Sequence, residues 1–372
     1  MEAAASAVKN VFGADTLIEA TEEIGSGYFG SVYRLELTKT AKGATTTTKI
    51  DTNSVVVKVL EGKKSTGFIE KLNDASVTES WSKFANEHWL PSLYACEEAA
   101  YVTLAKWAVS QTPKLIGASL RSDHKPATFV MEDLTGIGGV VDPDHYRPEQ
   151  VSALIKFLAE VHVKSIASDA WKDRMPQSLQ LHLAEFYSYL TKMHPIEGVI
   201  ALGPGFEKAK SFVKFLDPKS FSDAMFCVDE DENLPRVFVH GDFFPDNTLW
   251  DPSDAGKLVG VVDWQFAHVG SCMEDLARIL VSSNDHDALT PTKIDYWLQC
   301  YLTEVLRLQP AFPMTLDQLR RALNRKLPFM IMEYALNIVQ DLKRVTSEGE
   351  KQKYLRIGRE RFIALERIAA SV

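Results

Sequence analysis

The first sixty residues alternate between apolar and polar positions in a way that predicts β-strands. Over residues 31–37 apolar side chains recur at every second position, and residues 54–60 form an apolar, β-branched run that contains Lys58. A further short strand is expected around residues 23–25. The stretch 38–53 is rich in Thr, Lys and Gly, which is typical of a hairpin loop. We therefore expect an antiparallel sheet in this part of the chain.

Further along the chain the hydrophobic period changes to that of helices. Apolar residues recur at three- and four-residue spacing over 148–165, 177–193, 206–216, 293–306, 316–345 and 351–370. A short β segment at 237–262 interrupts these helices, and another strand is expected at 128–131. Residues 61–91 are polar with scattered aromatic side chains, and we expect one or two helices there.

This change of period predicts an α+β fold with two lobes. The small N-terminal lobe, residues 1–132, is expected to be an antiparallel β-rich layer with docked helices. The large C-terminal lobe, residues 133–372, is expected to be mainly helical and to carry the short β segment. A hinge at about 131–136 would join the lobes, and the chemistry is expected between them.

The composition fits two folded lobes, because 45% of the 372 residues are apolar. Fifty acidic against 41 basic residues give a formal charge of −9, which argues against nucleic acid or anionic lipid as a partner. The four cysteines have neither metal-ligand spacing nor the density of a disulfide scaffold, so we expect them to be reduced. The N-terminus does not resemble a signal peptide and no apolar run suits a membrane span, so we expect a cytoplasmic protein.

One segment carries residues suited to phosphoryl transfer. It contains His240, Gly241 and Asp242, with Asn247 five residues after the Asp and Asp263 after the next apolar strand. Asp242 is placed to accept the proton of an attacking hydroxyl group or to orient that group. Asn247 and Asp263 offer the hard oxygen ligands that Mg²⁺ prefers. The plainer alternative for Asp242 is an ordinary turn, because Gly-Asp is a common turn pair.

A glycine-rich segment near the N-terminus fits the pattern G-x-G-x-x-G-x-V, with Gly25, Gly27, Gly30 and Val32 at its fixed positions. The same pattern occurs in dinucleotide-binding folds and in glycine-rich turns. Here the residues that follow alternate like a strand and not like a helix, which favours the strand-loop-strand arrangement that covers ATP phosphates in kinases. Glycines would let backbone amides approach the phosphates closely.

Lys58 is the one charged residue within the apolar strand that follows this loop. The order of loop and lysine predicts that Lys58 binds the α- and β-phosphates of ATP; the alternative is a lysine on an edge strand that points to solvent. Such a lysine needs a carboxylate to hold it. Glu97, on an expected helix at 94–107, is the best candidate, and Glu98 is its nearest rival. Loop, lysine and acidic residues occur in the order that phosphoryl transfer requires.

Other polar and aromatic residues have plainer interpretations. We expect His162 to pack or hydrogen-bond inside the large lobe, His240 to fix the loop that carries Asp242, and Asp275 to cap or brace a helix. Four aromatic residues could form a wall that binds a quaternary ammonium group or a ring system, but we favour core positions, which are commoner for such residues: Trp264, Tyr296, Trp297 and Tyr301.

Together these motifs resemble the aminoglycoside phosphotransferase and choline kinase superfamily, whose fold is similar to that of protein kinases. The signature His-Gly-Asp appears at 240–242 with Asn247 after it, and the later metal-binding Asp-Trp appears at 263–264. Protein kinases would instead contain His-Arg-Asp, Asp-Phe-Gly and Ala-Pro-Glu with a long activation segment, and these are absent from the sequence.

Within this superfamily the segments 262–265 and 274–277 look most like the CHK-kinase-like, or ecdysteroid-kinase-like, branch. The resemblance implies a phosphotransferase that uses ATP and Mg²⁺ and acts on a hydroxyl group of a small-molecule alcohol. It also implies that the backbone around Met131, Glu132 and Asp133 meets the adenine ring.

The acceptor and one alternative function stay open. Residues 243–245 read Phe-Phe-Pro where the superfamily often has Leu-Trp, so amino alcohols, aminoglycoside-like alcohols and steroid-like alcohols all remain possible acceptors. The alternative is a kinase-fold protein that binds nucleotide and regulates or scaffolds a partner without turnover. The intact set of Lys58, Asp242, Asn247 and Asp263 argues against it.

Overall fold

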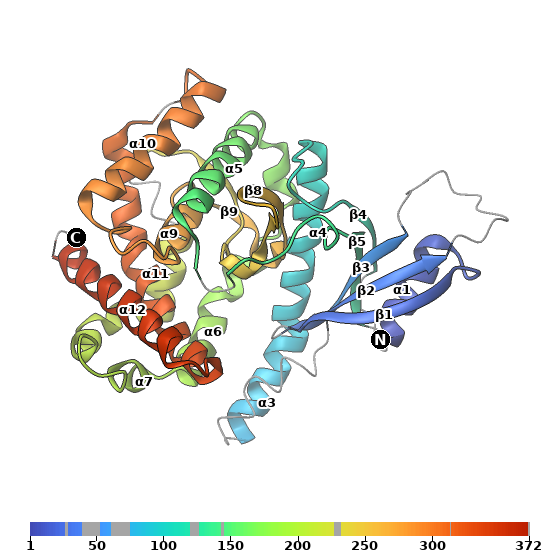
Figure 1. The fold of residues 1–372 in the computed structure, drawn as a ribbon, viewed down its shortest axis with the longest axis horizontal. Coiled ribbons are helices and arrows are strands. Elements are labelled where there is room, and N and C mark those ends of the chain that lie inside the picture. The colour runs from blue at the N-terminus through green and yellow to red at the C-terminus, as the bar shows by residue number, and fades with distance from the viewer. Residues whose placement is uncertain are drawn as a thin grey trace. The chain divides into compact units, whose positions relative to one another are not determined.

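Figure 1 shows the chain as a computed structural model that describes residues 1–26, 29–38, 53–60, 75–119, 126–142, 145–226, 232–312 and 314–370. Gly27 and Cys227, with most of the loop expected at 38–53 and residues 61–74, lie outside the described residues. The chain divides into two compact units. The first comprises Met1–Gly139 with Val259–Gln265, and the second comprises Val140–Leu258 with Phe266–Val372. The lobe boundary expected at 132/133 stays a prediction.

The first unit contains the expected antiparallel sheet. Its five strands lie in the order β1-β2-β3-β5-β4 and are β1 (Leu17–Ser26), β2 (Gly30–Thr38), β3 (Ser54–Leu60), β4 (Leu115–Ser119) and β5 (Ala127–Glu132). All neighbouring strands pair antiparallel. Strand β4 and the N-terminal helix α1 (Glu2–Phe12) were not expected from the sequence. In the segment 61–91, where one or two helices were expected, the described residues form α3 (Ala75–Phe84) and a π-helical turn, η2 (Ala85–Trp89). These continue into α4 (Leu90–Lys106).

The alternation of side chains gives this sheet two different faces. Val57 and the valines two residues to either side of it on β3 pack with residues of α1 such as Val8. Helix α1 lies against this face of the sheet (Figure 1). Lys58 and its partner across the ladder, Phe129, point to the opposite face. There the ring of Tyr94 on α4 stacks on Phe129 with centroids 4.7 Å apart. The sheet thus places Lys58 on the side where α4 packs.

The second unit is mainly helical, as expected. Its helices are α5 (Pro148–Ile166), η3 (Asp169–Arg174), α6 (Ser178–Met193), α7 (Ile196–Ile200), η4 (Glu207–Leu216), α8 (Pro218–Phe226), α9 (Glu274–Val281), α10 (Pro291–Leu308), α11 (Leu316–Arg344) and α12 (Glu348–Ala369). Helix α10 packs along α5, and α11 packs on both α9 and α12 (Figure 1). The segment expected as a helix at 206–216 is a 3₁₀ helix, and α7 and α8 were not expected.

Short strands surround the segment that carries Asp242. Strand β6 (Arg236–Val239) pairs antiparallel with β9 (His268–Ser271), and β7 (Thr248–Asp251) pairs with β8 (Asp254–Val261). Residues 240–247, which we call the 240–247 turn, connect β6 to β7 and end in the 3₁₀ turn η6 (Pro245–Asn247).

The described cysteines Cys96, Cys272 and Cys300 are free thiols. Within the described ranges no helix has both the length and the apolar character needed to cross a membrane.

Candidate active site

The 240–247 turn of the second unit brings Asp242 and Asn247 together. Gly241 adopts φ +79°, a left-handed conformation that glycine reaches without strain. The backbone carbonyl of Asp242 accepts hydrogen bonds from the amide of Phe244 at 2.8 Å and from Nδ2 of Asn247 at 2.8 Å. Nδ2 of Asn247 also lies 3.4 Å from Oδ2 of Asp242. The amide group of Asn247 therefore holds the carboxylate-bearing residue in place.

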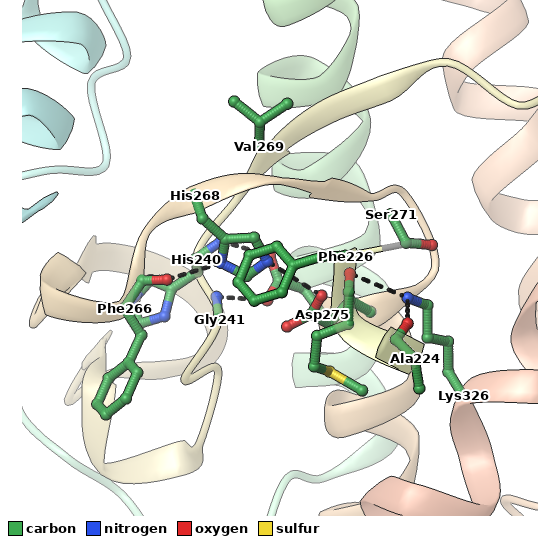
Figure 2. Close-up of polar contacts among 12 residues, drawn as sticks. Ala224, Phe226, His240, Gly241, Phe266, His268, Val269, Ser271, Asp275 and Lys326 are labelled. Carbon is green, nitrogen blue, oxygen red and sulfur yellow. Dashed lines mark hydrogen bonds and ion pairs between the residues drawn. The ribbon is translucent and has the colours of Figure 1, made fainter. Parts of the chain in front are cut away.

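Asp275 anchors this turn through its backbone amides. Its Oδ2 accepts from the N–H of His240 at 2.8 Å and its Oδ1 accepts from the N–H of Gly241 at 3.0 Å (Figure 2). Nδ1 of His240 in turn accepts from the N–H of Asp242 at 3.2 Å, so His240 fixes the loop as expected. Burial, together with repulsion by Glu274, raises the pKa of Asp275 to about 6 against these two hydrogen bonds. Asp275 thus supports the turn and does more than brace its own helix.

Arg278 brings a buried positive charge close to the turn. Its Nη1 donates to Oε2 of Glu333 on α11 at 2.6 Å, and its guanidinium lies over the ring of Phe244, 5.0 Å from the centroid. Burial would lower the pKa of Arg278, but attraction by Glu333 and Asp242, among others, raises it. A permanent cation therefore acts on the carboxylate of Asp242. No sequence pattern indicates this contact, because Arg278 and Glu333 are 55 residues apart.

In the first unit Lys58 is held between two carboxylates. It lies on β3, which has β2 and β5 on either side, and it is only 7% exposed, so the solvent-facing alternative is excluded. Its Nζ lies 2.7 Å from Oε2 of Glu97 and 2.7 Å from Oδ1 of Asp263, with Oε1 of Gln265 at 3.4 Å. Glu97, and not Glu98, is therefore the helix residue that pairs with Lys58.

Burial and attraction act in opposite directions on this ion pair. Burial alone would lower the pKa of Lys58, but the attraction of Asp263 and Glu97 outweighs it and raises the pKa above its usual value. Burial raises the pKa of Glu97 to about 7, although the attraction of Lys58 opposes it. Lys58 thus stays charged at neutral pH, and its attraction offsets the cost of burying the Glu97 carboxylate.

Asp263 and Asn247 each present an oxygen atom suited to a hard cation. Asp263 has φ +62°, an uncommon conformation for a residue other than glycine and one that is enriched at functional sites. One of its oxygens accepts from Lys58, and the side chain is 32% exposed, so the second oxygen can bind a ligand. Asn247 uses its amide nitrogen on the carbonyl of Asp242, which leaves its amide oxygen as an acceptor. Both donor types fit Mg²⁺.

The described residues of the glycine-rich pattern lie at the end of β1 and the start of β2, which pair antiparallel, so the pattern continues into a strand and not into a helix. Gly25 on β1 pairs with Val32 on β2. At Gly30 a Cβ atom would lie 2.3 Å from the carbonyl oxygen of Val59, so only glycine fits there. Val32 pairs with Lys58 across the β2–β3 ladder, which places the loop pattern and the lysine on neighbouring strands.

The residues expected to meet adenine lie at the end of β5. Met131 is buried. The N–H of Glu132 donates to the carbonyl of Lys114 at 2.9 Å, and Oδ2 of Asp133 accepts from Nε of Arg34 at 2.7 Å. The backbone amide of Glu132 is therefore already paired. Adenine contacts in this segment stay a prediction, and they would have to use other backbone groups.

The remaining residues singled out in the sequence mostly belong to the core. Nδ1 of His162 lies 2.8 Å from the hydroxyl of Tyr301, and burial lowers the pKa of His162 to about 3. Trp264 and Trp297 are also buried, whereas Tyr296 is 54% exposed. Tyr301 is therefore used inside the second unit and does not form part of an open aromatic wall.

Comparison with known proteins extends these observations. Residues 81–309 match the sequence profile of the phosphotransferase enzyme family. No curated protein sequence matches the chain. Among solved structures, the GDP complex of a mutant aminoglycoside 2′-phosphotransferase-IIIa is similar with a TM-score of 0.50 and 14% identity, over 99% of this chain and 96% of that one. Plasmodium vivax ethanolamine kinase is similar with a TM-score of 0.51 and 12% identity, over 98% and 88% of the two chains. At these identities the likeness concerns the fold, and it confirms the expected kinase-like architecture.

Proposed function

Because the chain belongs to the phosphotransferase enzyme family, we propose that it transfers the γ-phosphoryl group of ATP to a hydroxyl group of a small molecule. Family membership also confirms the superfamily resemblance read from the motifs at 240–247 and 263–264. Family membership indicates phosphoryl transfer, and we propose in addition that ATP is the donor, that Mg²⁺ is bound and that a hydroxyl group is the acceptor.

The observation that carries the proposal is the buried arrangement around Lys58, whose Nζ lies 2.7 Å from both Glu97 and Asp263. A buried charge is costly unless it is paired, and here two carboxylates hold one ammonium group in a fixed position. A lysine fixed in this way is suited to bind the α- and β-phosphates of a nucleotide. The described glycines of the β1–β2 hairpin, Gly25 and Gly30, would cover the phosphates from the neighbouring strands.

The 240–247 turn would serve the acceptor. Asp242 would accept the proton of the hydroxyl group while the hydroxyl oxygen forms a bond to the γ-phosphorus and the bond from that phosphorus to the β–γ bridging oxygen breaks, which releases ADP. Asn247 and Asp263 would hold Mg²⁺, whose charge would offset that of the transferred group. Arg278 would attract the carboxylate of Asp242 from nearby.

The acceptor class is open within small-molecule alcohols. The similar structures are an aminoglycoside phosphotransferase bound to GDP and a kinase of ethanolamine, which supports a nucleotide donor and makes amino alcohols and aminoglycosides the first compounds to test. Steroid-like alcohols complete the set, because the motifs at 262–265 and 274–277 resemble that branch.

The test is incubation with Mg²⁺-ATP and a pooled metabolite extract supplemented with apolar alcohols, followed by mass spectrometry for phosphorylated species. Asp242→Asn should lower turnover by roughly 10²- to 10⁴-fold and keep nucleotide affinity. Asp246→Asn is the matched control, because Asp246 is an exposed acid of the same turn. Equal turnover by the parent and by Asp242→Asn would refute the role of Asp242.

Two other results would assign a different function. Tight ATP binding by the parent, with no phosphorylated product from any compound, would favour the regulatory or scaffold protein. Phosphate transfer to added proteins but not to metabolites would favour an unusual protein kinase.

A further inference from the structure

A buried network of titratable side chains lies near the 240–247 turn in the second unit (Figure 2). It consists of His268 on β9, Glu274 at the start of α9 and Lys326 on α11, which are 5%, 1% and 0% exposed. Lys326 donates hydrogen bonds to the carbonyl groups of Ala224 and Met225 in the last turn of α8. Burying three titratable groups is costly unless their charges are matched.

Both ring nitrogens of His268 have a partner. Nδ1 lies 2.8 Å from the carbonyl oxygen of Phe266, which can only accept, so Nδ1 carries a hydrogen (Figure 2). Nε2 lies 3.3 Å from Oε2 of Glu274. An ionised Glu274 also only accepts, in which case both nitrogens carry hydrogens and the ring is an imidazolium.

The charges around His268 favour this ionised pair. Burial would lower the pKa of His268, but attraction and hydrogen bonding to Glu274, with further attraction by Asp275, raise the pKa above 6.5. Burial would raise the pKa of Glu274, but His268, Lys326 and Arg278 lower it below 4.5. The contacts of both ring nitrogens and the direction of both pKa shifts therefore favour a buried imidazolium-carboxylate pair.

The carbonyl group of Phe266 connects His268 to the turn. A Cβ atom at Gly241 would lie 2.4 Å from this oxygen, so the backbone of the turn packs directly on it. The same turn is held by Asp275 through the amides of His240 and Gly241. The turn is thus fixed by Asp275 and by the Phe266 peptide, and the Phe266 peptide is in turn bound by His268.

We propose that His268, as an imidazolium paired with Glu274, is a positioning residue that fixes Asp242 through the carbonyl group of Phe266. This inference rests on the proposed role of Asp242 in phosphoryl transfer. His268 acts by holding the Phe266 peptide against Gly241. Loss of the Nε2 proton would turn a nitrogen lone pair toward the Glu274 carboxylate, and the repulsion would loosen this contact.

Two substitutions separate the two contacts of His268. His268→Asn keeps a donor near the position of Nδ1, and with it the bond to Phe266, but loses the contact with Glu274. His268→Gln keeps a donor near the position of Nε2 and loses the bond to Phe266. His162→Gln is the control, because His162 is another buried histidine of the second unit and its partner is Tyr301.

The measurements are hydrogen exchange of the peptide that covers residues 239–247 and ADP release from Mg²⁺-ATP at neutral pH, with the alcohols of the supplemented metabolite extract as phosphoryl acceptors. His268→Gln should exchange faster in this peptide and release ADP about tenfold more slowly at an unchanged KM for ATP. His268→Asn should stay within about threefold of the parent. As pH rises through the raised pKa of His268, ADP release by the parent should decrease, and this decrease should be absent from His268→Asn.

Three outcomes would overturn the inference. In the first, both His268 variants exchange and release ADP like the parent, and in the second, both are impaired equally. In the third, His162→Gln is impaired as much as His268→Gln, which would make His268 no more than a stabilising core residue. The proposed function can fail separately. If exchange responds as expected but Asp242→Asn releases ADP as fast as the parent, the contact stands and the role of Asp242 is wrong.

Discussion

Arg278 and Glu333, 55 residues apart in the chain, form an ion pair of 2.6 Å inside the helical unit. The arginine is 4% exposed and the side chain of the glutamate is 15% exposed, so neither charge is well hydrated when its partner is removed. Arg278→Met should therefore lower the free energy of unfolding by about 3–5 kcal/mol. The double variant Arg278→Met/Glu333→Leu should lose less unfolding free energy than Arg278→Met, because it leaves no uncompensated charge at position 333.

Urea denaturation of the parent, both single variants and the double variant gives the coupling energy of this pair. Additive losses would mean that the two side chains stabilise the unit independently, contrary to the ion pair.

Gly241 is expected to be irreplaceable for reasons of space as well as conformation. Gly241 and Gly203 both have positive φ, 79° and 92°, so alanine at either position carries a strain of about 1–2 kcal/mol. At Gly203 nothing lies within 4 Å of an added Cβ, whereas at Gly241 it would meet the Phe266 carbonyl at 2.4 Å. Gly241→Ala should displace the turn and slow ADP release roughly 100-fold. Gly203→Ala should leave the rate unchanged, and circular dichroism of both variants would show that they fold.

Asp275 should make stability depend on pH in an unusual direction. Its pKa of about 6 lies above the ordinary value of 3.8, so between these values the unfolded chain binds fewer protons than the folded protein. The contribution of Asp275 to the free energy of unfolding therefore decreases as pH rises from about 4 to about 6. Asp275→Asn should lack this slope, and it should cost about 1–3 kcal/mol because one of the amides of the turn loses its acceptor.

Urea unfolding across this pH range measures the difference in unfolding free energy between the parent and Asp275→Asn. The contributions of the other titrating groups cancel in this difference. Parallel pH profiles would mean that Asp275 does not titrate in this range.

Lys58 should control nucleotide affinity. Lys58→Met keeps the apolar stem and removes the ammonium group, so the loss of about 1.5–3 kcal/mol of charge-assisted hydrogen bonding should weaken Mg²⁺-ATP binding roughly 10- to 100-fold. Lys114→Met is the control, because the Lys114 side chain is 82% exposed and lies in the same unit. Calorimetric titration of both variants tests this, and equal affinities would remove Lys58 from the nucleotide site.

The sequence predicted the parts of the site whose spacing is local. The alternation around Lys58 and the order of the motifs led to the sheet and to the pairing of β2 with β3. The choice between Glu97 and Glu98 needed the structure, because adjacent residues of a helix point about 100° apart and only the packing of α4 on the sheet decides which one meets the lysine. The N-terminal helix α1 was missed because its apolar face is recognisable only beside the valines of β3 that it covers.

The contacts that support Asp242 were missed for a different reason. Asp275 lies 34 and 35 residues from the amides that it binds, and Arg278 pairs with a residue on another helix. Such pairs depend on how the helices pack, and single residues of these types are common on any helix surface. His268 is close in sequence to its partners Phe266 and Glu274, but a histidine without a known environment does not indicate its protonation state.

Chemical modification of Lys326 would detect local opening of the second unit. Its ammonium group is 0% exposed and is bound to the carbonyl groups of Ala224 and Met225, so an amine-reactive reagent cannot reach it while the helices remain packed. The rate at which this lysine is modified, measured by peptide mapping, would therefore report how often α8 and α11 separate. Exposed lysines such as Lys219 would react without any opening and would give the reference rate for an accessible amine.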